Sequence, residues 1–229
     1  MNYLIIGCSL VFFLLPACQN SPQVQTGEDA EVIQGNLVRV DHARTKLAYI
    51  DPSADFKKYS AILLAPLGVE NVEIIQPSYS RRAAGNRNWE LTDADKIRLQ
   101  NDFQNALSKQ LSLRGTYPLV TASGDNVLLI AAKLTRIAPT APKDDNRSRP
   151  AGRSAIVTEG AGKISVEVTF SDSETGEVLA LAKDTRSGSS LWGLNNSITN
   201  QAQVRRVFNS WAIQIRGQLD KVHDQSIEE

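Results

Sequence analysis

Apolar residues recur along the chain at two different spacings, and these spacings separate the strands from the helices. Between 164 and 170, apolar and polar residues alternate strictly, which is the period of a strand with one buried face. A second apolar run at 178–182 follows a turn that contains Gly176. We therefore expect these two runs to form an antiparallel hairpin. Further strands are predicted at the following apolar segments: 38–40, 61–65, 69–75, 118–120 and 127–135.

Two segments instead carry apolar residues at helical spacing. The first begins after Thr92, an N-cap residue with Asp95 three positions later in the manner of a capping box, and Gly115 is expected to end it as a left-handed C-cap. The second begins near Asn200 and places its apolar residues on one face. The two stripes are Leu99, Phe103, Ala106, Leu107 and Leu111, and then Val204, Phe208, Trp211, Ile215, Leu219 and Val222. Each helix has one face to bury, which predicts a two-layer α+β fold with a mainly antiparallel sheet and two amphipathic helices packed on one face.

The N-terminus carries an apolar run at 4–15 that ends in Leu15-Pro16-Ala17-Cys18. The run is shorter than the ~20 residues that cross a bilayer and has the length of a signal peptide's apolar region. The sequence at Cys18 resembles a bacterial lipobox, so we expect cleavage between Ala17 and Cys18, with diacylglycerol and an N-acyl chain on Cys18. An ordinary secretory signal and an uncleaved short anchor are the alternatives. Because Gln19 is not the Asp associated with inner-membrane retention, the expected location is the periplasmic face of the outer membrane.

Composition and length then bound the rest of the chain. We expect a signal peptide at 1–17, a flexible tether at 18–35, a single α+β domain at 36–224 and a tail at 225–229. The 229 residues include 25 Lys and Arg and 25 Asp and Glu, so the net charge of zero does not favour a nucleic-acid partner. The two cysteines are Cys8, lost with the signal, and Cys18, used by the lipid, which leaves no disulfide and no cysteine metal site.

Few residues are candidates for catalysis or metal binding. His42 and His223 are isolated in the sequence, and neither has the spacing of a metal ligand. Asp51 and Asp55 lie on either side of a proline-containing turn. We interpret both as residues that cap this turn, and the alternative is that they are the acid–base pair of a hydrolase. We therefore predict no enzyme activity, no metal and no cofactor besides the acyl chains on Cys18.

The segment Tyr49-Ile50-Asp51-Pro52-Ser53-Ala54-Asp55-Phe56-Lys57-Lys58-Tyr59 resembles the opening of an uncharacterised Gram-negative lipoprotein family, domain of unknown function 3313. The helix start at 91–95, the strand at 127–134 and the segments 167–179 and 208–212 follow in the order of that family. The resemblance covers roughly 49–222. It implies a small exported domain of no known activity and transfers no catalytic residues.

Two long polar stretches, 76–89 and 139–160, are the expected contact surface of the domain. Their candidate partner-contact residues are Arg81, Arg82, Arg87, Trp89, Arg147 and Arg149. The leading hypothesis is a non-enzymatic envelope protein that is held to the membrane by lipid and binds an envelope protein partner, as an assembly or accessory module. The alternative is a carrier of a lipidic or apolar ligand between the sheet and the helices.

Overall fold

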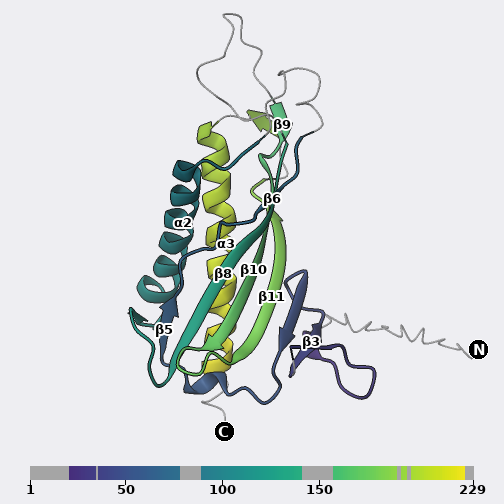
Figure 1. The fold of residues 1–229 in the computed structure, drawn as a ribbon, viewed down its shortest axis with the longest axis vertical. Helices are drawn as coiled ribbons and strands as arrows, with labels where there is room; N and C mark the ends of the chain where they lie inside the picture. Colours follow the sequence, from purple (N-terminus) through teal and green to yellow (C-terminus); the bar gives the residue numbers. More distant parts are fainter. Residues whose placement is uncertain are drawn as a thin grey trace, which may run out of the picture.

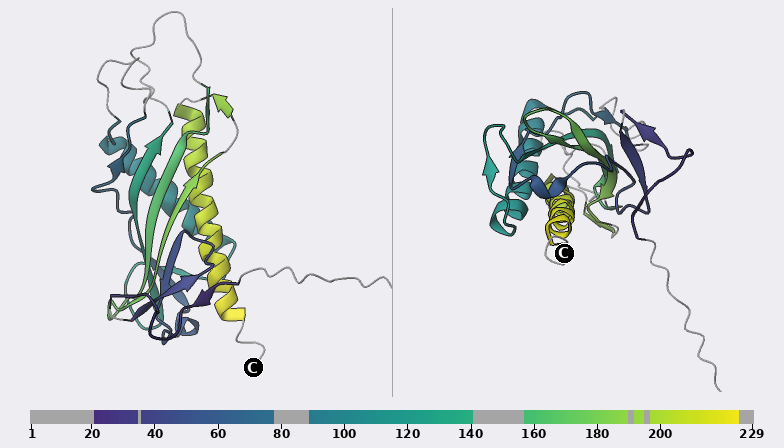
Figure 2. Two further views of the ribbon diagram at one scale, coloured as in Figure 1. Left: turned by 90° about the vertical axis from the view of Figure 1, so that its right-hand side faces the viewer. Right: turned by 90° about the horizontal axis from the view of Figure 1, so that it is seen from below.

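The computed structural model describes residues 21–34, 36–77, 89–140, 157–189, 192–194 and 197–224. Within them, the chain forms an open, mostly antiparallel ten-stranded sheet and two long helices that pack together (Figure 1). The sheet curves around the helices, which is clearest in the view from below in Figure 2. The predicted α+β class is confirmed.

Three long strands form the centre of the sheet: β8 (Val127–Pro139), β10 (Gly162–Asp172) and β11 (Val178–Ser187). The predicted hairpin is confirmed by β10 and β11, whose register pairs Val168 with Ala182 and Phe170 with Ala180. Gly176 lies in the connecting turn with a φ of 75°, where a side chain would be strained. β8 pairs antiparallel with the other edge of β10.

One side of the sheet is parallel, which the sequence pattern did not indicate. β5 (Ala61–Leu64) pairs in parallel with both β8 and β7 (Leu119–Val120), and β6 (Glu73–Ile74) also pairs in parallel with β8. The helical segment 93–113 connects β5 and β6 to β7 and β8. Parallel neighbours follow because a helical crossover returns the chain to the end at which the first strand began.

On the other side of the sheet, four short strands form what we call the N-terminal wing, residues 23–50. It contains β1 (Gln23–Val24), β2 (Val32–Ile33), β3 (Leu37–Asp41) and β4 (Leu47–Ile50). β4 pairs with β11, β3 pairs with β4, and both β1 and β2 pair with β3. The backbone from Gln23 to Ile33, expected within a flexible tether, is therefore hydrogen-bonded to the sheet at both of its ends, where β-branched Val24, Val32 and Ile33 favour strand geometry.

The helices are α2 (Asp93–Ser108), which continues as a π-helical turn at Lys109–Leu113, and α3 (Ser197–Asp224). The predicted capping box is confirmed: Asp95 N donates to Thr92 Oγ1 at 3.2 Å, and Thr92 N donates to Asp95 Oδ2 at 3.1 Å. Gly115 lies after the last turn, but the prediction of a left-handed cap is wrong because its φ is not positive. Glycine is needed there because a Cβ would lie 2.5 Å from the Leu111 carbonyl oxygen.

The core lies between the sheet and the two helices, which run side by side in the same direction (Figure 1). Phe103 of α2 meets Phe208 of α3 edge to face at 5.3 Å, and Phe208 is fully buried. Trp211 is buried as predicted, and its Nε1 donates to Asp184 Oδ2 at 2.9 Å. No helix in the described part of the chain is both long and apolar enough to cross a membrane.

Candidate functional site

A cavity of about 250 Å³ lies where β8 ends, β10 begins and both long helices start. Its apolar wall comes from four separate parts of the chain: Trp89, Leu91 and Leu99, Ile137, Ile164, and Val204. The described parts of the two long polar stretches are 76–77 and 89 in the first and 139–140 and 157–160 in the second, and Trp89 and Pro139 line the cavity. The described part of the expected contact surface thus includes an apolar hollow.

Glycines allow the backbone to close tightly around this cavity. Gly162 has a φ of 130°, and a Cβ on it would lie 2.3 Å from the Ala138 carbonyl oxygen. A Cβ on Gly188 would lie 2.4 Å from Gln203 Cβ, so only glycine lets the end of β11 approach α3 this closely. Gln203 Oε1 in turn accepts a hydrogen bond from Ala161 N at 2.8 Å, which fixes α3 to the start of β10.

The polar side chains that line the cavity carry both charges. Arg98 lies 3.7 Å from Asp95, and Asp102 accepts from Arg205 Nε at 2.9 Å; Lys163 also lines the cavity. An apolar hollow surrounded by paired charges is typical of the centre and rim of a protein-binding surface. Such a site can hold an apolar side chain, while the rim offers hydrogen bonds to the groups around it.

Trp89 is the one predicted contact residue within the described chain. Its main chain is held on both sides by the Gln76 amide: Trp89 N donates to Gln76 Oε1 at 2.6 Å, and Gln76 Nε2 donates to Trp89 O at 3.0 Å. These two hydrogen bonds fix the backbone just before α2, at the point where Trp89 lines the cavity. The other predicted contact residues, Arg81, Arg82, Arg87, Arg147 and Arg149, lie outside the described residues, as do Ala17 and Cys18.

The remaining wall residues were missed by the sequence reasoning because they are distant along the chain. Leu91, Leu99 and Val204 belong to helix starts, and Ile137 and Ile164 to strand ends. Only the parallel direction of α2 and α3 brings these ends together. A direct signal in the sequence was limited to Trp89, an aromatic residue three positions before the N-cap residue Thr92.

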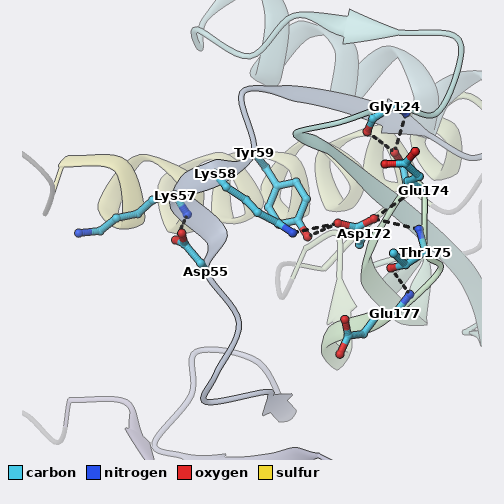
Figure 3. Close-up of polar contacts among 10 residues, drawn as sticks. Asp55, Lys57, Lys58, Tyr59, Gly124, Asp172, Glu174, Thr175 and Glu177 are labelled. Atoms are coloured by element: carbon cyan, nitrogen blue, oxygen red, sulfur yellow. Dashed lines mark hydrogen bonds and ion pairs between the residues drawn. The ribbon is translucent and has the colours of Figure 1, made fainter.

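A polar network lies at the other end of the sheet, around Asp172, the last residue of β10 before the turn to β11 (Figure 3). Asp172 Oδ1 accepts from Glu174 N and Thr175 N, both at 3.0 Å. Asp172 Oδ2 accepts from Tyr59 OH at 2.8 Å and from Lys58 Nζ at 3.1 Å. Hydrogen bonds, first from Thr175 N and then from Tyr59, hold the pKa of Asp172 well below its usual range.

Asp51 and Asp55 cap turns, as the sequence interpretation expects. Asp51 is buried and accepts from Ser53 N at 2.8 Å and Ser53 Oγ at 2.6 Å, and these hydrogen bonds lower the pKa of Asp51. Asp55 accepts from Lys57 N at 3.0 Å and caps the short 3₁₀ helix Phe56–Lys58. Each carboxylate is thus engaged within its own turn.

The two histidines lie in different surroundings. His42 has a φ of 55° in the turn after β3, and the His223 ring packs at 5.5 Å from the Tyr117 ring. Across the described ranges, no three His, Cys, Asp or Glu side chains are grouped so that they could hold a metal ion.

Residues 36–215 match the family described as "Protein of unknown function (DUF3313)". No curated protein matches the chain. Among solved structures, a Xanthomonas campestris protein of family DUF330 is 11% identical, with 74% of this chain and 88% of that chain covered and a TM-score of 0.41. The Paraburkholderia phytofirmans PelC dodecamer (12% identical, 71% and 88% covered, TM-score 0.35) and a Helicobacter pylori neuraminyllactose-binding hemagglutinin homolog (10%, 74% and 88%, TM-score 0.38) are also similar. These are similarities of fold alone.

Proposed function

We propose, since the chain belongs to the DUF3313 family of proteins of unknown function, that it is a non-enzymatic binding module of the bacterial envelope. In this proposal acyl chains on Cys18 hold it on the periplasmic face of the outer membrane. Its partner is an envelope protein that inserts an apolar side chain into the cavity beside Trp89. It uses no cofactor and binds no nucleic acid.

The observation that carries this proposal is the place of the apolar cavity relative to the N-terminal strands. Gly162 and Ile164 line the cavity, whereas Phe170 at the other end of β10 pairs with Ala180, which pairs with Ile50 of the wing. The eight residue-to-residue steps from 162 to 170 span roughly 26 Å at the ~3.3 Å rise of a strand. A chain tethered through the wing therefore leaves its cavity accessible to a partner.

The size of the cavity favours a protein partner over the alternative of a carried lipid. Its volume of about 250 Å³ is below the ~300 Å³ at which pockets for small ligands begin. Between the sheet and the helices, the space expected for a lipid is filled by buried side chains such as Phe103, Leu107 and Phe208. One apolar side chain of a partner fits the remaining volume.

In-cell photo-crosslinking tests the partner. A photo-reactive amino acid is placed at Gln201, which lines the cavity, or at Gln218, an exposed glutamine on the same helix far from it. We expect a discrete adduct with a protein of the envelope from position 201 and none from position 218. Equal adducts from both positions, or a lipid as the product at position 201, would refute the proposal.

Substitution at Val204 gives a matched pair of variants for the same test. Val204 lines the cavity and is only partly buried, so Val204→Phe should fill the hollow and Val204→Ala should enlarge it. The adduct at position 201 is expected to be lost with phenylalanine and kept with alanine. Equal adduct yields from the two variants would show that the hollow is not the docking point.

The anchor is tested separately by Cys18→Ser. This variant should lose acylation and move from membrane to soluble fractions. Three acyl chains make release of the wild-type protein from the membrane negligible, and the variant carries none of them. Unaltered fractionation would refute the anchor and leave the crosslinking result standing.

A further inference from the structure

The N-terminal wing has two unlike faces, and one of them is covered by its own side chains. Leu37 and Tyr49 on this face form a small buried cluster with Leu181. Above it, Arg39 Nη1 donates to Glu31 Oε2 at 2.7 Å, and Tyr49 OH donates to the same carboxylate. Polar groups therefore close this face of the wing.

The opposite face of the wing is apolar. The register pairs Val24 with Val40, Val32 with Val38, and Val38 with Ile50. Paired residues of antiparallel strands place their side chains on the same face, and residues two apart do so as well. These five residues therefore form one face, on which Val24 is 38% exposed and Val32 is 50% exposed.

The chain before the wing is short. β1 begins at Gln23, five residues after Cys18, so a fully extended chain spans about 18 Å between their Cα atoms. A tether over 18–35 would instead have reached about 60 Å. Pairing of β1 and β2 with β3 thus holds the wing close to any membrane that holds Cys18.

We propose that this apolar face of the wing docks on the membrane leaflet that holds the acyl chains of Cys18. The inference rests on the acylation of Cys18 proposed above, and the short link and the exposed valines select the bilayer as the occupant. The exposed turn after β3 carries His42, Arg44 and Lys46, whose basic side chains suit anionic headgroups. Exposed acids also occur in the wing, at Glu28 and Asp29 in the loop between β1 and β2 and at Glu31.

The test uses the full acylated protein in vesicles of phosphatidylethanolamine and phosphatidylglycerol that contain a nitroxide-labelled lipid. Because Cys18 is acylated, Val32→Cys or Ile97→Cys supplies the free thiol for a fluorescent label. Ile97 is the matched control, an apolar residue on α2 that is 58% exposed. We expect the nitroxide to quench the label at position 32 several-fold more than at position 97. Equal quenching would overturn the proposal.

A second variant tests the valines while it keeps the strands. Threonine is β-branched and nearly isosteric with valine, so Val24→Thr with Val32→Thr preserves the backbone preference but removes apolar surface. A label at Thr26 should lose most of its quenching in this variant while the protein stays on the vesicles. Unchanged quenching would count against the docking face. Equal quenching at positions 32 and 97, with the protein still held on the vesicles through Cys18, would overturn this inference alone. Vesicle association that does not need Cys18 would refute the anchor on which it rests, and a missing partner adduct would refute only the role of the cavity.

Discussion

The hydrogen bond between Tyr59 and Asp172 gives the sharpest test of the network at the β10–β11 turn. Asp172 Oδ1 accepts hydrogen bonds from backbone N–H groups of the turn, and Oδ2 accepts from the side chains of Tyr59 and Lys58. Asp172→Asn keeps the first acceptor and replaces the second by an NH₂ group that faces the Tyr59 hydroxyl. The carboxyl side chain is only 13% exposed and Tyr59 is buried, so we expect a loss of about 1.5–3 kcal/mol, the range of a charge-assisted hydrogen bond.

A double-mutant cycle with Tyr59→Phe isolates this interaction. Free energies of unfolding are measured by urea titration with circular dichroism on the Cys18→Ser form. Because each single change removes the same hydrogen bond, the double variant should be less destabilised than the sum, with a coupling of about 1.5–3 kcal/mol. Additive effects within ~0.5 kcal/mol would refute the reasoning.

The same residue predicts a pH dependence. The folded-state pKa of Asp172 lies well below the ~3.9 of an unfolded chain, so the folded state binds fewer protons than the unfolded state in this range. The stabilisation is complete above pH ~5, where the unfolded carboxyl is ionised, and is lost as the pH falls through the folded pKa. The gap in stability between the wild type and Asp172→Asn should therefore narrow from pH ~5 to pH ~2. A gap that stays constant would contradict this assignment.

Further predictions concern packing, and urea unfolding measures each of them. Gly188→Ala should cost about 1–3 kcal/mol, because its Cβ would overlap Gln203. Gly217→Ala, in α3 with nothing within 4 Å of the added Cβ, should instead stabilise by up to ~1 kcal/mol. Thr92→Ala removes the capping box and should cost about 1 kcal/mol. Phe208→Ala should cost about 3–5 kcal/mol, since the ring is fully buried; a loss below ~1 kcal/mol would mean that the core is not packed as described.

Local patterns in the sequence predicted the helices and the central hairpin well. Alternation at 164–170 is visible without knowledge of the partner strand, because one face of the hairpin is buried and the other is not. The capping box at Thr92 is equally local, since its donors and acceptors lie within four residues.

What the sequence did not show depends on contacts between distant segments. Two-residue strands such as β1 and β2 are too short for a period to be seen, and only pairing with β3 defines them. Gly115 was correctly placed at the end of the helix, but its role comes from the approach of the Leu111 carbonyl rather than from a left-handed backbone. The cavity was missed for the same reason, because helix starts and strand ends meet there only after the sheet is assembled.

The outermost strands of the sheet are among its shortest, and this has a consequence for behaviour at high concentration. The strand order ends with β1 on one side and β7 on the other, each of two residues. Such short edges offer few unpaired backbone groups for another chain to extend, which is how natural sheets avoid aggregation. Proteins confined to a surface meet one another far more often than proteins in solution do. On the membrane location proposed above, this open sheet could therefore be crowded without recruiting its own copies into a continuous sheet.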